Sequence, residues 1–262
     1  MERTLVHYLP LVTTGVAAGF AVVLFRHWRS KPDAKYLMWW TAGVTVYGLG
    51  TLAESLTTIF GWSEPVFRLW YIAGALMGGV LLAQGVVYLL VSERTADRLT
   101  RILLVYLSIA TLLILFVPVD SAAADPYQLS GEVIEWDWVR LFTPVANIYA
   151  VFWLVGGAIW SAWRYFRTDT GTARRVWGNI AIAVGAILPA MGGSFAKAGR
   201  VEGLYATELI GLILIWVGYR IIVTDPGPSI HAAQADTELT VDLTDQAESA
   251  AGLGDDSELL AD

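Results

Sequence analysis

The chain has 262 residues, of which 56% are hydrophobic and 16% charged, and its formal net charge is −7. Its 12 tryptophans and positive mean hydropathy make it too apolar for an ordinary soluble domain, so we expect an integral membrane protein that has the lipid bilayer as a partner. No nucleic-acid partner is expected. The absence of cysteine excludes disulfides, thiolate metal sites and cysteine nucleophiles. The three histidines, His7, His27 and His231, are scattered, so we expect no histidine-held metal or haem cofactor.

Seven apolar runs are each long enough to cross about 30 Å of hydrocarbon. They cover residues 5–25, 36–60, 66–91, 102–119, 141–163, 176–196 and 203–223. Each should be a helix, because lipid cannot hydrogen-bond backbone groups that an open structure leaves unpaired. The first run is followed by the cationic stretch FRHWRSK with no convincing cleavage site, so we expect a retained helix rather than a signal peptide. The sequence therefore predicts an all-α membrane domain of seven transmembrane helices over residues 1–224.

Arginine and lysine concentrate in the odd-numbered loops between these runs, whereas the even-numbered loops are poorer in cations and the fourth is acidic. The odd-loop cations are Arg26, Arg29, Lys31, Lys35, Arg94, Arg98, Arg101, Arg164, Arg167, Arg174 and Arg175. Positive charge is retained on the cytoplasmic side of a membrane. We therefore expect a multi-pass protein of the cell membrane with its N-terminus outside and its C-terminus in the cytoplasm.

The segment 225–262 differs in character from the rest of the chain. It holds ten acidic residues and no lysine or arginine, giving a charge of −10, while residues 1–224 carry 17 basic and 14 acidic residues, or +3. Low hydrophobicity with high net charge is typical of disorder. We expect an acidic cytoplasmic tail that is solvated, with docking to a cytoplasmic partner as the alternative.

A constant offset of 138 residues lays the first two runs over the fifth and sixth without a gap. Gly19 then falls on Gly157, and Arg26 falls on Arg164. Together with the shared orientation of the two copies and an odd fourth helix, this favours a parallel 3+1+3 repeat. That plan resembles the topology of the SWEET sugar transporters and their PQ-loop relatives. Their Pro-Gln motif is absent, because Pro10 and Pro144 are followed by leucine and valine, so no binding residue is carried over.

Three further stretches carry a resemblance that covers most of the chain. They are RLWYIAGALMGGVLLAQGVVYLL at 68–90, GNIAIAVGAILPAMGGS at 178–194 and YATELIGLILIWVGYR at 205–220. In these stretches the chain is similar to a family of uncharacterised seven-helix membrane proteins from bacteria and archaea. The resemblance implies a seven-helix fold and a prokaryotic membrane as its compartment, and it implies no activity.

Small and polar residues at helical spacing predict which helix faces point inward, since lipid-facing surfaces are large and apolar. The second, third, fifth and sixth runs show such faces, which should surround the interior. The inward polar positions are Tyr47, Gln84, Asn147 and Asn179. Two GxxxG pairs, Gly15 with Gly19 and Gly74 with Gly78, predict close packing within the chain, and Pro189 predicts a kink in the sixth helix.

Charged residues lie at similar depth towards the outer end of the predicted bundle. They are Glu54, Arg68, Arg140, Lys197 and Glu208. A charge inside a membrane is costly, so these groups should point inward and be paired or hydrated. We expect Glu54 to pair with Arg68, and Glu208 to pair with Lys197 or Arg140. Two readings stay open: the residues form a solute-binding cluster, or they only lock helix ends together.

The residues exclude or disfavour several activities. Retinal attachment is excluded, because no lysine lies in the run 203–223. Catalysis is not expected, because no aspartate lies within a span and no serine has a histidine at similar depth. The leading hypothesis is the binding or transport of an unknown small solute in a cavity between the two helix triplets. The alternative is a sensory or scaffold module that acts through its cytoplasmic loops and tail. The oligomeric state, the coupling ion and the solute stay open.

Overall fold

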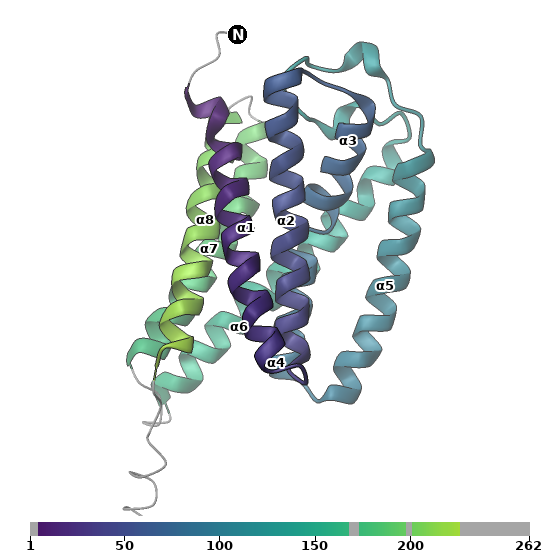
Figure 1. The fold of residues 1–262 in the computed structure, drawn as a ribbon. Helices are drawn as coiled ribbons and strands as arrows, with labels where there is room; N and C mark the ends of the chain where they lie inside the picture. The colour runs from purple at the N-terminus through teal and green to yellow at the C-terminus, as the bar shows by residue number, and fades with distance from the viewer. Residues whose placement is uncertain (1–4, 168–172, 198–200, 226–262) are drawn as a thin grey trace, which may run out of the picture.

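The computed structural model describes residues 5–167, 173–197 and 201–225, and within these residues every named element is a helix (Figure 1). The long helices are α1 (Leu9–Ser30), α2 (Lys35–Phe60), α4 (Val80–Leu90), α5 (Glu93–Phe116), α6 (Phe142–Arg167), α7 (Ala173–Lys197) and α8 (Val201–Val223). The short ones are η1 (Leu5–Tyr8), α3 (Glu64–Trp70), η2 (Tyr71–Leu76), η3 (Ser121–Ala123), η4 (Gly131–Val133) and η5 (Asp137–Leu141). The prediction of an all-α fold is confirmed. The predicted tail over 225–262 lies, beyond its first residue, outside the described part of the chain.

Five helical segments of the described chain are long and apolar enough to cross a membrane. They are Leu9–Ser30, Glu64–Leu90, Glu93–Phe116, Asp137–Arg164 and Glu202–Val223. Helices α2 and α7 are long, yet they do not belong to this set. In α2 the sequence TLAESLTT brings a glutamate and several hydroxyl groups into the apolar run, and most of these residues are buried against other helices. The structure thus supports a membrane protein, and polar residues on inward faces reduce the apolar signal of its central helices.

Six of the helical segments form a ring. Around it, α1 packs against α2, α2 against the α3–η2–α4 segment, α4 against α6, α6 against α7, α7 against α8, and α8 against α1. Helix α5 stands outside this ring, at the right-hand edge of the bundle in Figure 1, where it contacts α4, η2 and η5. Only 22% of its apolar window is buried, so one side of α5 packs and the rest is free to face lipid.

The third predicted span is interrupted in its middle. It consists of α3, the π-helical turn η2 and α4, with a further turn at residues 77–79. The Met77 N–H donates to the Ile72 carbonyl at 3.0 Å, one residue further back than in an α-helix. Gly78 and Gly79 follow, and glycine is the weakest helix former after proline. Helix α7 continues through Pro189 as one helix, so the kink predicted there stays a prediction.

Glycines allow the ring helices to approach closely. A Cβ atom on Gly50 of α2 would lie 2.6 Å from the Gly74 Cα of η2, and a Cβ on Gly185 of α7 would lie 2.6 Å from the Gly211 carbonyl oxygen of α8. Of the glycines in the two GxxxG pairs, Gly74 does serve a close contact between helices. Gly15 does not, because a Cβ there would meet nothing within 4 Å.

The segment 118–141 folds into a compact cap over one end of the ring, at the top right of Figure 1. Val119 and Ile134 form an antiparallel β-bridge, and the backbone N–H of Trp62 donates to the Pro126 carbonyl at 2.8 Å. Four apolar side chains of the cap are buried beneath it: Leu129, Val133, Ile134 and Val139. We call this end of the bundle the cap end. The opposite end, with the α1–α2 and α4–α5 connections, is the arginine-rich end.

Candidate functional site

The two predicted intramembrane carboxyl groups meet each other inside the ring. Glu54 of α2 and Glu208 of α8 lie within hydrogen-bonding reach, although α1 packs between these two helices on the outside. Glu54 lies six residues before the end of α2, and Glu208 seven residues after the start of α8. At 1.5 Å per residue, both lie about 10 Å from the cap end of their helices. Helix direction therefore places the two carboxyl groups at a common depth.

Aromatic side chains surround this carboxyl pair. The Trp70 indole N–H donates to Glu54 Oε1 at 2.9 Å, and the Tyr47 hydroxyl donates to the Glu208 backbone carbonyl at 3.2 Å. Tyr205, one turn before Glu208 on α8, is 3% exposed and lies close enough to interact electrostatically with both carboxyl groups. Trp70 and Tyr205 carry no sequence signal that separates them from the many aromatic residues at helix ends. Only their position in the fold assigns them to the site.

Both carboxyl groups have an oxygen atom without a donor. Glu54 is 4% exposed, and its Oε2 atom and the Oε2 atom of Glu208 are buried with no hydrogen-bond partner among the described residues. Glu208 as a whole is only partly buried. Because two carboxylate oxygens are both acceptors, a contact between them is a hydrogen bond only when one of the two groups carries a proton. The geometry therefore suits a pair that shares one proton.

The expected pairing of Glu54 with Arg68 is wrong. The Arg68 guanidinium instead forms an ion pair with Glu64 one turn earlier, at 2.6 Å. It also donates to two carbonyls at the end of α5, those of Ile114 and Val117, the latter at 2.9 Å. The last carbonyls of a helix have no partner within it and carry partial negative charge, so they attract a cation. Arg68 thus fastens the end of α5 rather than neutralising the carboxyl pair.

Of the other two predicted cations, Arg140 has a different partner and the Lys197 side chain is not among the described residues. Arg140 lies in η5 and forms an exposed ion pair with Asp137 at 3.2 Å, so its expected pairing with Glu208 is also wrong. Lys197 is the last residue of α7, and its side chain lies outside the described residues. Its predicted contact with Glu208 therefore stays a prediction. Asp137 lies three residues before Arg140, one helical turn away, and is therefore within reach of its guanidinium.

Of the two asparagines predicted to point inward, Asn179 is buried as predicted, whereas Asn147 is exposed. Asn147 is exposed on α6, because the buried face of that helix is formed by Ala146, Ala150 and Leu154. Asn179 is 9% exposed, and its side-chain amide donates to the Arg175 carbonyl of its own helix at 2.8 Å. Small residues lie on two adjacent faces of α6. The face that packs against the neighbouring helices is the one that carries Ala146 and Ala150. Neither asparagine lies with the carboxyl pair.

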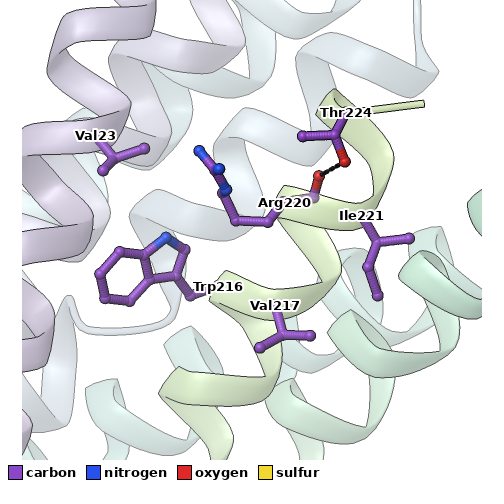
Figure 2. Close-up of a pocket in the computed structure, with 6 residues that line it drawn as sticks. All are labelled: Val23, Trp216, Val217, Arg220, Ile221 and Thr224. Carbon is purple, nitrogen blue, oxygen red and sulfur yellow. Dashed lines mark hydrogen bonds between the residues drawn. The ribbon is translucent and has the colours of Figure 1, made fainter. Parts of the chain in front are cut away.

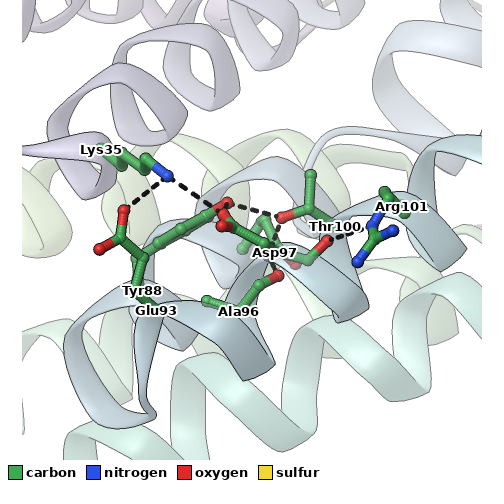
Figure 3. Close-up of polar contacts among 8 residues, drawn as sticks. Lys35, Tyr88, Glu93, Ala96, Asp97, Thr100 and Arg101 are labelled. Carbon is green, nitrogen blue, oxygen red and sulfur yellow. Dashed lines mark hydrogen bonds and ion pairs between the residues drawn. The ribbon is translucent and has the colours of Figure 1, made fainter.

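Gln84 lies at the centre of a separate polar network on the arginine-rich side of α4. Its side chain is fully buried, its Nε2 donates to Thr100 Oγ1 at 2.7 Å, and its Oε1 accepts from the Tyr149 hydroxyl at 2.6 Å. The network continues to Tyr88, whose hydroxyl donates to Asp97 Oδ1 at 2.7 Å (Figure 3). These contacts connect α4 with α5 and α6, so they hold the outlying helix α5 against the ring.

At its outer limit this network ends in ion pairs. The Lys35 ammonium, at the first residue of α2 and outside the apolar run 36–60, contacts Glu93 Oε1 at 2.7 Å and Asp97 Oδ1 at 3.2 Å (Figure 3). Hydrogen bonds to these two carboxylates, chiefly to Glu93, raise the pKa of Lys35 above its ordinary value. All three side chains are substantially exposed, so salt screens the contact. Lys35 thus ties the start of α2 to the start of α5.

An open groove lies between α1 and α8 near the arginine-rich end (Figure 2). Its volume is about 510 Å³. Its walls are Val23, Trp216, Val217, Arg220, Ile221 and Thr224. It lies twelve residues along α8 from Glu208, or about 18 Å, so it is not the environment of the carboxyl pair. Its lining is mostly apolar, and Arg220 and Thr224 are its polar residues.

Metal binding finds no support among the described residues, since no three histidine, cysteine, aspartate or glutamate side chains converge there. No protein-family model, curated protein or solved structure matches this chain. The resemblance to seven-helix membrane proteins therefore stays a prediction.

Proposed function

We propose that this protein spans the membrane seven times, with the cap end outside, and that it binds or transports a small solute at the centre of the ring. The observation that carries the proposal is the Glu54–Glu208 pair, whose two Oε2 atoms are buried and which joins α2 and α8 across the interior. Ionisable groups inside a membrane are costly and are retained mostly where they handle ions, protons or substrates. A contact that served only to fasten two helices would not need two like groups.

The order of helices around the ring supports the same proposal. If α1, α2 and the α3–α4 segment form one triplet, and α6, α7 and α8 form the other, the carboxyl pair joins one triplet to the other. Helix α5, which lies outside the ring, then corresponds to the single helix that connects the two triplets in a 3+1+3 repeat. Transporters built from repeats bind substrate where the repeats meet, and they move one repeat against the other.

The interrupted third span adds a second element suited to movement. Trp70, the donor to Glu54, is the last residue of α3, directly before the π-helical turn η2. Interruptions of this kind recur at functional sites in membrane helices. A change at the carboxyl pair would therefore act on the segment of the ring that is least constrained by regular hydrogen bonding.

A thermal-shift screen tests the proposal. Purified full-length protein in detergent or nanodiscs is heated with a panel of sugars, amino acids and small carboxylic acids at several pH values. A ligand present at 100 times its Kd stabilises the folded state by about 2.7 kcal/mol, so even weak binding is detectable. Compounds that stabilise the wild type are then tested on Glu208→Gln, with the exposed Glu64→Gln as the matched control.

We expect Glu208→Gln to weaken binding of such a compound at least about tenfold, or 1.4 kcal/mol, while Glu64→Gln leaves it unchanged. Equal binding by both variants would place the solute elsewhere. A panel with no stabilising compound, together with folding that depends on Glu54 and Glu208, would leave only their role in joining helices.

A further inference from the structure

We propose that Glu54 and Glu208 form a binding site for one exchangeable proton. This inference rests on the proposed function, because it names the ion that would be coupled to solute binding. It stands on three features of the structure: the mutual contact of the two carboxyl groups, their two donor-free Oε2 atoms, and the burial of Glu54.

The donor set fits a proton better than a metal ion. A hard cation needs several oxygen ligands at fixed distance, and the pair supplies only two carboxyl groups. No third acidic or histidine side chain joins them among the described residues. A metal ion would also have to separate the two groups, whereas they lie in direct hydrogen-bonding reach. One proton on either group supplies the donor that a hydrogen bond between the two carboxyl groups requires.

The surroundings of the pair favour a single negative charge rather than two. The groups that face it are Tyr47 from α2, Tyr205 from α8 and the indole of Trp70 from α3. Asp125 of the cap and Glu202 at the start of α8 lie near Tyr205, and they add negative charge on that side. From α1 the neighbouring group is the hydroxyl of Thr14, bonded to Thr51. Among these described groups there is no cation to compensate a second carboxylate.

Release of the proton has a mechanical consequence. The O–H bond of the shared carboxyl breaks, the proton passes to a water molecule, and both groups become carboxylates in contact. Like charges at this distance repel strongly in a medium of low dielectric constant. The repulsion acts between α2 and α8, and therefore between the two triplets. Binding of one proton therefore favours an arrangement in which the two triplets are in contact, and its release favours their separation.

Infrared spectroscopy tests the proposal without requiring a transported solute. Full-length protein in lipid bilayers is titrated from acidic to alkaline buffer, in H₂O and in D₂O, and the C=O band of protonated carboxyl groups is followed. We expect one protonated carboxyl per chain at neutral pH that responds to D₂O and is lost on alkalinisation. The double variant Glu54→Gln/Glu208→Gln should lack it, and each single variant should move the midpoint of its titration. Glu64→Gln should match the wild type.

The proposal would be overturned by the absence of a protonated carboxyl in the wild type at neutral pH, or by a band that survives in the double variant. Unmoved midpoints in both single variants, or loss of the band when sodium replaces potassium, would also overturn it. The sodium result would identify a metal-ion site instead. A band altered by Lys197→Gln would also overturn it, because the lysine would then already neutralise the pair. If the double variant does not fold, the single-variant midpoints decide. Solute binding can survive any of these outcomes, so failure of the proton site is distinct from failure of the proposed function.

Discussion

At the scale of single residues, the hydrogen bond from Trp70 to Glu54 should contribute measurably to the stability of the fold. Apart from Glu208, the Trp70 indole N–H is the one described donor to the Glu54 carboxyl, at 2.9 Å. Trp70→Phe keeps an aromatic ring and removes that donor, so the buried oxygen loses its partner. We expect a loss of about 1–3 kcal/mol in the free energy of unfolding. Thermal or denaturant unfolding in lipid nanodiscs measures the change.

Trp62→Phe is the matched control at the same end of the bundle. The Trp62 indole nitrogen is buried without a hydrogen-bond partner in the described structure, so its replacement costs ring area and no hydrogen bond. A Trp62→Phe variant as unstable as Trp70→Phe would show that the ring of Trp70, and not its contact with Glu54, matters for stability.

At the scale of helical elements, glycine contacts set how closely the ring packs. The Cβ of a Gly50→Ala variant would lie 2.6 Å from the Gly74 Cα, where backbone cannot move aside easily. We expect about 1–3 kcal/mol of destabilisation from this overpacking. The control is Gly15→Ala, where nothing lies within 4 Å and alanine is the better helix former by up to about 1 kcal/mol. Unfolding of both variants in nanodiscs gives the comparison, and equal stability would contradict the close contact of α2 with η2.

Helix α5 offers a second test at this scale, because it lies outside the ring and is fastened near both ends. Arg68→Met removes the guanidinium that binds the Ile114 and Val117 carbonyls. We expect faster amide hydrogen exchange in residues 111–117, measured by mass spectrometry, with little change at the Gln84 network. Arg140→Met removes a mainly exposed ion pair and serves as the control. Equal exchange in the two variants would mean that apolar packing alone holds this end of α5.

At the scale of the whole molecule, the proposed topology can be tested because the chain has no cysteine. Ser30→Cys lies at the arginine-rich end, Ser121→Cys lies in the cap, and both positions are exposed. With seven spans and the cap outside, a membrane-impermeant maleimide should label Ser121→Cys in intact cells and Ser30→Cys only after permeabilisation. Labelling of both positions from one side would contradict the proposed number of spans, and the reverse pattern would contradict the orientation.

Much of the fold follows from the sequence, because hydropathy acts locally along a helix. Apolar runs and cationic loops marked the helices, and the carboxylates Glu54 and Glu208 stood out as charges within such runs. The interruption of the third span was not predicted, since GALMGG is also a common packing sequence in membrane helices. The folded structure of the cap segment 118–141 was not predicted either, because its short helical turns show no periodic pattern of apolar residues.

The sequence by itself determined that this is an all-helical, strongly apolar chain with two carboxyl groups where lipid would not tolerate them. Only the tertiary structure decided that Glu54 lies against Glu208 and Trp70, while Arg68 turns to Glu64 and the end of α5. The physical reason is that helical periodicity fixes which face a side chain occupies, but not which helix lies opposite that face. That choice depends on how glycine contacts, caps and ring closure rotate each helix against its neighbours.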